Sequence, residues 1–254
     1  MKRNSFQHNG LKLSYLDTGG DGQPLIALHA HWMEAGTYTQ LASALAPKWR
    51  VVSLDQRGHG YSDHAQSYSR EDYLGDLSAL IRHLEIDKAV FLGNSLGGVN
   101  AYQYAAKYSQ QVKALIIEEI GAVIEADVSF TLRWGGVFQS REALAERIGE
   151  RLLPYLVDSF RQTSDGWQLA FDPQEMVASQ LKLNGDHWTD WLTSSCPALL
   201  IRGRESRLTT QAHLEEMSMK RPNTRLVSLD GGHIVHKDNP IGFTECVQEF
   251  LQSI

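Results

Sequence analysis

A serine flanked by glycines lies where this sequence passes from an apolar run into a helical pattern. Ala89-Val90-Phe91-Leu92 leads into Gly93-Asn94-Ser95-Leu96-Gly97, and helix-forming residues follow. A serine on such a sharp turn has strained backbone angles and an exposed Oγ, as a nucleophile for acyl transfer requires. Glycines on both sides let neighbouring chain pass close by, and the helix N-terminus adds partial positive charge beside a developing oxyanion. The spacing predicts Ser95 as a nucleophile, against the simpler interpretation of a glycine-rich turn with a capping serine.

A serine nucleophile requires a general base, and one of the 10 histidines lies in a suitable context. His233 follows the apolar run Leu226–Leu229 and the pair Gly231-Gly232 near the C-terminal end. We predict that His233 takes the proton of the Ser95 hydroxyl. The competing candidate is His236, three residues further on, whose context is more typical of a packing or hydrogen-bonding residue.

The elements that must position these residues alternate between strands and helices. Asn9-Gly10, a strong hairpin signal, separates Ser5–His8 from Leu11–Asp17 and predicts an antiparallel edge pair. Further along, short apolar runs, most with turn signals after them, predict buried strands with helices between them. The fold class is therefore α/β, with a doubly wound and mostly parallel sheet. The predicted buried strands are Leu25–His29, Val51–Asp55, Ala89–Gly93, Ala114–Ile117, Ala198–Ile201 and Leu226–Leu229.

One long region, from 122 to 188, interrupts this alternation. It contains no convincing strand, only helical stretches such as Arg141–Tyr155 and Pro173–Leu183, and tryptophans are scattered through it. An insertion of this size between two strands predicts a helical cap, an element that covers active sites and selects substrates. The expected organisation is an α/β core of residues 1–121 and 189–254 with a helical cap of residues 122–188.

Several motifs in this order resemble the α/β-hydrolase superfamily over nearly the whole chain. Leu28-His29-Ala30-His31-Trp32 stands where the family usually has His-Gly after its third strand. The turn 55–62 matches D-x-R-G-x-G-x-S, Gly231-Gly232-His233 matches the histidine loop, and the glycine-flanked serine matches the nucleophile elbow. Two departures are visible, Ala30 in place of the usual glycine and Asn94 in place of the usual histidine or glutamine. The resemblance implies an α/β-hydrolase fold and a serine hydrolase.

By the same resemblance, two backbone N–H groups hold the oxyanion of a tetrahedral intermediate. One belongs to Leu96, and the other belongs to a residue just after His29-Ala30. We predict His31 for the second donor, with Trp32 as the alternative. Each such donor is worth roughly 3 kcal/mol. Ala30 in place of glycine is expected to reshape this loop slightly.

The acid of the expected triad is displaced in this sequence. Most of the family places an aspartate after the strand Ala198–Gly203, and Ser206 occupies that position here. A serine carries no charge to stabilise an imidazolium, and loss of this carboxylate typically lowers kcat about 10⁴-fold. Some α/β-hydrolases without this aspartate, such as zearalenone-lactone hydrolases and certain amide hydrolases of vitamin B6 breakdown, carry the acid at an earlier strand end. By resemblance to them the acid here is Glu119, directly before Ile120-Gly121.

Three alternatives to Glu119 stay open from the sequence. Alternation along a strand sends Glu118 and Glu119 to opposite faces, so at most one of them should reach His233. If Glu118 is not the acid, it is expected to be a solvated residue at a strand end. If Glu205 is not the acid, it is expected to be stabilised by the dipole at a helix N-terminus. The third alternative is a site without an acid.

Composition limits the partners and cofactors. The 254 residues, 42% hydrophobic and 21% charged, suit one large globular α/β domain. A net charge of -6 argues against nucleic acid or an anionic membrane as a main partner. Cys196 and Cys246 lack metal-binding spacing, no dinucleotide loop follows the first parallel strand, and no signal peptide or membrane span is apparent. We expect no metal, no cofactor and a cytoplasmic location, and the oligomeric state stays open.

The predicted function is hydrolysis of a small carboxylic ester or lactone through an acyl-enzyme on Ser95. An amide, or a carbon–carbon bond beside a ketone, is the second choice of bond. The tryptophans of the expected cap favour an apolar or aromatic small-molecule substrate, and they equally suit packing inside the cap. Two rivals come from other classes. One is a non-catalytic ligand receptor, which Ser206 in the acid position keeps open, and the other is a cofactor-free oxygenase or perhydrolase.

Overall fold

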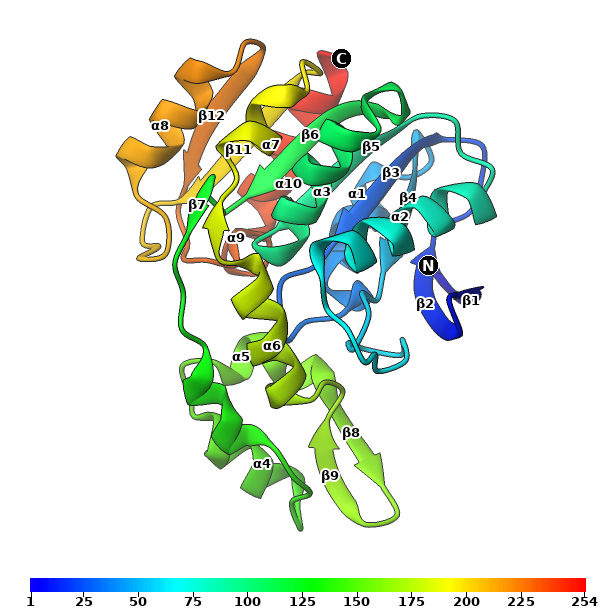
Figure 1. Cartoon of the computed structure of the whole chain (residues 1–254), viewed down its shortest axis with the longest axis vertical. Helices are drawn as coiled ribbons and strands as arrows, with labels where there is room; N and C mark the ends of the chain where they lie inside the picture. The colour runs from blue at the N-terminus through cyan, green and yellow to red at the C-terminus, as the bar shows by residue number, and fades with distance from the viewer.

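An eight-stranded sheet forms the centre of the computed structural model, which describes residues 1–254 (Figure 1). Its strand order is β1-β2-β4-β3-β5-β6-β11-β12. β1 pairs antiparallel with β2, as Asn9-Gly10 predicted, and β2 pairs antiparallel with β4. All later neighbours pair in parallel. The strands are β1 (Lys2–His8), β2 (Leu11–Asp17), β3 (Gln23–Leu28), β4 (Trp49–Leu54), β5 (Ala89–Asn94), β6 (Val112–Glu118), β11 (Ala198–Gly203) and β12 (Thr224–Leu229).

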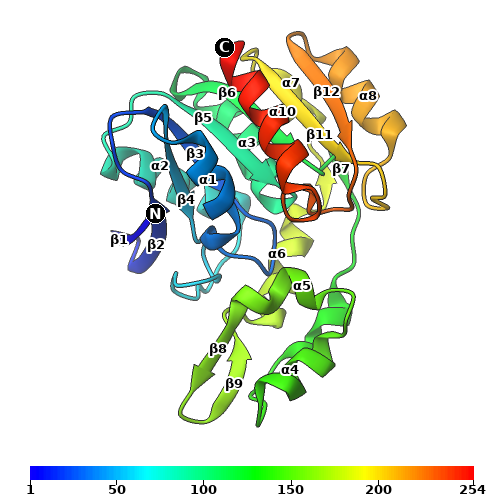
Figure 2. The same ribbon diagram turned by 180° about the vertical axis from the view of Figure 1, so that it is seen from behind.

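Helices cover both faces of this sheet, so the doubly wound α/β fold is confirmed. Apolar side chains of α2, α3 and α8 pack in the core on one face, and those of α1 and α10 pack on the other (Figures 1 and 2). The helices of this core are α1 (Thr39–Leu45), α2 (Arg70–His83), α3 (Leu96–Lys107), α8 (Gln211–Lys220), α9 (Val235–Asp238) and α10 (Pro240–Gln252), with short 3-10 helices η1 (Ala35–Tyr38) and η2 (Ser109–Gln111). None of the helices has the length and apolarity needed to span a membrane.

The segment 122–188, here called the insertion, is not all-helical as expected. The stretch Arg141–Tyr155 does not form one helix, because Gly149 ends α4 with a φ of 89°. The expectation of no strand is also wrong, since β8 and β9 form a hairpin across a two-residue turn. The elements of this region are β7 (Val123–Ile124), η3 (Ser129–Trp134), α4 (Arg141–Ile148), α5 (Leu153–Leu156), η4 (Val157–Ser159), β8 (Phe160–Thr163), β9 (Gly166–Leu169), α6 (Pro173–Leu183), β10 (Gly185–Asp186) and, just beyond it, α7 (Trp188–Thr193).

The insertion lies beyond the edge of the sheet where the parallel strands end (Figures 1 and 2). Polar contacts join it to the loop that follows β3. The Ser159 hydroxyl donates to the carbonyl oxygen of Trp32 at 2.7 Å, and the Ser179 hydroxyl lies 2.9 Å from Nε2 of His31. The carboxyl edge of the sheet, where sites form in open α/β folds, is therefore adjacent to α6 and η4.

Candidate active site

Ser95 lies at the turn between β5 and α3 in a strained backbone conformation. Its φ of 52° and ψ of -116° are rare for a residue with a side chain. The flanking glycines are required by close packing, because a Cβ on Gly97 would lie 2.1 Å from the Leu28 carbonyl oxygen and one on Gly93 would lie 2.2 Å from the Gly97 backbone. The Ser95 N–H donates to the Glu118 carbonyl oxygen at 3.0 Å, which ties the turn to the end of β6.

Asn94, at the departure from the usual family residue, joins this turn to the histidine loop. Its side chain is fully buried, and Nδ2 donates to the carbonyl oxygen of His233 at 3.1 Å and to that of Glu118 at 3.2 Å. A single amide therefore fixes the residue before Ser95 against the backbone of His233. No sequence pattern predicted this role for Asn94.

Glu119 and His233 are brought together by the fold. Glu119 is fully buried at the end of β6 with a φ of 53°, and its Oε2 lies 3.4 Å from Nδ1 of His233. The His233 side chain is 23% exposed, so the imidazole lies between the buried carboxylate and the open side. A separation of 3.4 Å is long for a hydrogen bond, and such contacts commonly tighten when a substrate binds.

Two further groups hold the Glu119 carboxylate. The Gly203 N–H donates to Oε1 at 2.7 Å, and the hydroxyl of buried Thr209 lies 3.0 Å from both carboxylate oxygens. These donors compensate the cost of burying a charge. Sequence reasoning missed Thr209, although it lies only three residues after Ser206 in the loop where the usual acid is absent.

Neither Ser206, at the usual position of the acid, nor Glu205 hydrogen-bonds the imidazole of His233. The Ser206 hydroxyl accepts from the Leu208 N–H at 3.2 Å within its own loop. Glu205 is exposed. Neither side chain hydrogen-bonds to His233, whose only side-chain contact of this kind is with Glu119.

Glu118 is not the solvated strand end that was one expectation for it. Its carboxylate is fully buried and accepts from the His236 N–H at 2.9 Å, with Nδ1 of the same histidine at 2.8 Å. Nε2 of His236 lies 2.7 Å from the Thr37 hydroxyl. Burial and the nearby Glu118 charge raise the pKa of Tyr38, whose ring lies against that of His236, well above its ordinary value. As expected, only one of the two acids reaches His233, although Glu119 follows β6 with a φ of 53° and so is not itself part of the extended strand.

The predicted oxyanion donors lie on neighbouring elements. Leu96 is the first residue of α3, so its N–H has no acceptor within the helix. His31 and Trp32 follow β3, whose last residue, Leu28, packs against Gly97. The His31 imidazole is buried, and burial, aided by His59 and Arg70, lowers its pKa well below the ordinary value. A neutral His31 ring carries no charge to stabilise an anion, so the predicted contribution of this residue is its backbone N–H.

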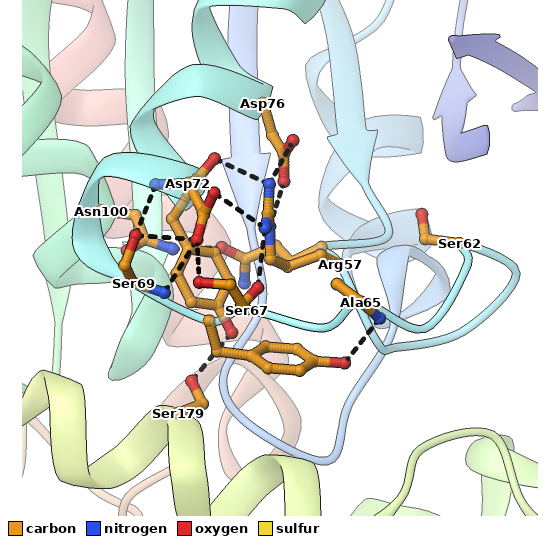
Figure 3. A network of polar contacts seen from close by, with 12 residues as sticks. Arg57, Ser62, Ala65, Ser67, Ser69, Asp72, Asp76, Asn100 and Ser179 are labelled. Atoms are coloured by element: carbon orange, nitrogen blue, oxygen red, sulfur yellow. Dashed lines mark hydrogen bonds and ion pairs between the residues drawn. The ribbon is translucent and has the colours of Figure 1, made fainter. Parts of the chain in front are cut away.

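The turn 55–62 has a structural role beside these residues (Figure 3). Arg57 is buried and binds Asp76 of α2 through two hydrogen bonds, Nε to Oδ2 at 2.7 Å and Nη2 to Oδ1 at 2.9 Å. A bidentate pair of this kind is among the strongest side-chain hydrogen bonds. It fixes the turn against the first half of α2.

Residues that could bind a metal do not converge anywhere in the chain. No group of three or more His, Cys, Asp or Glu side chains is placed to share an ion. Cys196 and Cys246 are both free thiols. The chemistry available at the carboxyl edge of the sheet is therefore that of a serine hydroxyl, an imidazole, a carboxylate and backbone N–H groups.

Comparisons with known proteins identify the family of the chain. The alpha/beta hydrolase family profile matches residues 25–245. The chain is 25% identical over 249 residues to 2-(acetamidomethylene)succinate hydrolase of Mesorhizobium japonicum, covering 92% of this chain and 90% of that protein. A crystal structure of E-2-(acetamidomethylene)succinate hydrolase superposes with a TM-score of 0.89 at 22% identity, covering 99% of both chains. The enol-lactonase from Burkholderia xenovorans LB400 superposes with a TM-score of 0.82 at 22% identity, covering 98% of this chain and 100% of its own. Because the profile spans most of the sequence, this chain belongs to the alpha/beta hydrolase family.

Proposed function

We propose that the protein is a serine hydrolase that cleaves a small carboxylic ester or lactone through an acyl-enzyme on Ser95. The observation that carries this proposal is the Glu119 carboxylate, buried, held by Gly203 and Thr209, and 3.4 Å from Nδ1 of His233. A buried carboxylate next to an imidazole activates a hydroxyl nucleophile. Here Asn94, the residue before the strained Ser95, hydrogen-bonds the backbone of that histidine.

The proposed mechanism assigns one role to each group. His233 takes the Ser95 proton through Nε2 as Oγ attacks the carbonyl carbon, and Glu119 stabilises the imidazolium that forms. The N–H groups of Leu96 and His31 stabilise the oxyanion of the tetrahedral intermediate. His233 then protonates the leaving group, and a water molecule activated by the same imidazole releases the acid from Ser95.

The names of the relatives widen the choice of bond. One relative is named for hydrolysis of 2-(acetamidomethylene)succinate, which carries an amide, and one structural neighbour is named an enol-lactonase. An amide hydrolase on the same triad is therefore the second candidate. Both reactions proceed through the same acyl-enzyme and differ in the leaving group.

We also propose that the insertion acts as a cap that selects substrates. Trp32, beside the proposed oxyanion donor, contacts Phe130 and Trp134 of η3, with ring centroids 6.1 Å and 5.7 Å away. These edge-on aromatic contacts place an apolar surface of the insertion next to the loop that follows β3. The arrangement supports recognition of an apolar part of the substrate.

Labelling with a fluorophosphonate tests the proposed function directly. Only an activated serine reacts, so we expect the wild-type protein to be labelled once, at Ser95, as measured by intact mass and peptide mapping. A panel of esters, lactones and amides then identifies the bond. A wild-type protein that stays unlabelled would favour a ligand receptor instead of an enzyme.

Exchange of the insertion for that of a family member with other substrates tests the cap. We expect the order of kcat/KM across the panel to change, while labelling of Ser95 stays within about threefold, because the triad residues all lie outside 122–188. The panel and the fluorophosphonate are measured on the same preparations. An unchanged order of substrates in a well-folded exchange variant contradicts the cap assignment.

A further inference from the structure

Arg70 carries a largely enclosed guanidinium without an acidic partner. It is the first residue of α2, and its guanidinium lies against α3, where Nε donates to Gln103 Oε1 at 2.9 Å and Nη2 donates to Asn100 Oδ1. Nη1 is buried and has no hydrogen-bond partner. No carboxylate oxygen lies within 4.0 Å of its nitrogens, since the ion pairs of the chain do not include Arg70.

Comparison with Arg57 shows why an enclosed arginine without an acidic partner is unusual. Arg57 reaches the same helix, is buried, and is neutralised by Asp76 through a bidentate ion pair (Figure 3). Arg70 hydrogen-bonds only two neutral amide oxygens and lies over the ring of Tyr73, 5.2 Å from its central carbon. The carboxylates of Asp190 and Glu71 act on it from beyond ion-pair distance. Burying a guanidinium without an anion is costly, and this burial lowers the pKa of Arg70. The fold therefore retains a guanidinium that no carboxylate contacts directly, with one nitrogen, Nη1, left without a partner.

Two independent observations place this charge beside the proposed oxyanion site. Leu96, Asn100 and Gln103 stand at i, i+4 and i+7 of α3, so the residues that hold Arg70 share a helix face with the first proposed donor. Along the helix axis Asn100 is only about 6 Å from Leu96. On the other side, the charge of Arg70 contributes to the lowered pKa of His31, the second proposed donor.

We infer that Arg70 binds a carboxylate of the substrate, so that the protein acts on monoesters or monoamides of short dicarboxylic acids. The inference rests on the proposed function and specifies its acyl group. The free carboxylate pairs with Nη1, and the second carboxyl carbon of the acyl chain is the one that Ser95 attacks. Asn100 and Gln103, which hold Arg70, stand about 6 and 10 Å along α3 from Leu96, and this proximity favours a short acyl chain. Charge-assisted hydrogen bonds to guanidinium give such recognition its strength and direction.

The insertion contacts two side chains near this cation. Ser179 of α6 lies 2.8 Å from the Tyr73 hydroxyl and 2.9 Å from the His31 imidazole, and the Tyr73 ring lies 5.2 Å from the central carbon of Arg70. Because Nη1 is buried, the proposal requires neighbouring side chains to move when the carboxylate binds.

Matched pairs of esters test the inference. 4-Nitrophenyl hemisuccinate and 4-nitrophenyl butyrate have acyl chains of the same length and differ in a terminal carboxylate or methyl, and the hemiglutarate and valerate form the next pair. We expect the wild-type protein to prefer the acidic ester of at least one pair in kcat/KM. Arg70→Gln should lower the acidic-to-neutral ratio about 100-fold, the value of a strong hydrogen bond to a charged group. Arg82→Gln, an exposed arginine of the same helix that bonds only Ser78, should leave the ratio unchanged.

Binding to an inactive variant separates this inference from the proposed function. Ser95→Ala should bind succinate or glutarate in a calorimetric titration, and the double variant with Arg70→Gln should lose that binding. Retained dicarboxylate binding without wild-type turnover of any substrate would overturn the proposed function and leave the anion site standing. Active wild-type protein that prefers the neutral esters, or an Arg70→Gln variant that loses both esters equally, would overturn the assignment of Arg70. Circular dichroism and the melting temperature of each variant check that it folds.

Discussion

Replacement of Ser95 by alanine is expected to lower kcat about 10⁶-fold, because loss of the nucleophile costs as much as loss of the whole triad. The side chain makes no hydrogen bond that the fold needs, while its backbone N–H, which bonds the Glu118 carbonyl oxygen, is kept in alanine. The strained φ of 52° is likewise a property of the backbone and not of the hydroxyl. Stability should therefore change little while turnover is lost. The measurement is kcat on the best substrate of the ester, lactone and amide panel.

The control for Ser95→Ala is Ser109→Ala, which removes an exposed hydroxyl from η2 at the far end of α3. This variant should keep wild-type turnover and full fluorophosphonate labelling. The alanine variant at 95 should show neither. Turnover at the wild-type rate in Ser95→Ala would refute the nucleophile assignment, whatever the labelling shows.

The sheet was predictable because parallel strands covered on both faces must be apolar throughout. Each of the six buried strands inferred from an apolar run is present, with ends displaced by at most two residues. The hairpin at Asn9-Gly10 follows from local backbone preference alone, and both residues have positive φ. These signals depend on residues close together in the chain, so no knowledge of the tertiary structure was needed.

The parts that the sequence did not reveal depend on contacts between distant segments. The β8–β9 hairpin is short and polar at its tip, and Phe138 stabilises it by two backbone hydrogen bonds of 2.8 Å with Trp167. Glu118 is buried because His236, more than a hundred residues away, supplies its donors. Thr209 has no motif of its own, and its role appears only once β6 and β11 lie side by side.

The predicted site residues differ in whether a local sequence pattern was enough to identify them. Ser95 and His233 follow strands and have glycines within two positions, so local pattern and family resemblance both point to them. For Glu119 only resemblance distinguished it from Glu118 and Glu205. The structure places its carboxylate next to His233, which supports the proposal that it is the triad acid.

Glu119→Gln is expected to lower kcat about 10⁴-fold, equivalent to near 5.5 kcal/mol of transition-state stabilisation. The amide has the shape of the carboxylate and is neutral, so it cannot stabilise the imidazolium that forms on His233. Turnover of the best substrate by wild-type and variant protein measures the effect. Ser206→Ala should cost less than tenfold, and Glu205→Gln, an exposed acid of the same loop, serves as the matched control.

The donors around the carboxylate determine how the introduced amide must sit. The Gly203 N–H donates to Oε1 of Glu119 at 2.7 Å, so in the Glu119→Gln variant the amide oxygen has to occupy that position. The NH₂ group then faces Nδ1 of His233, where the Oε2 atom lies at present. An amide donor at this place requires an unprotonated Nδ1, which leaves the proton on Nε2, the nitrogen that must accept the proton of Ser95. The variant should therefore keep its fold and lose fluorophosphonate labelling in parallel with kcat. Mild loss in Glu119→Gln together with severe loss in Ser206→Ala or Glu205→Gln would show that the acid lies after β11 instead.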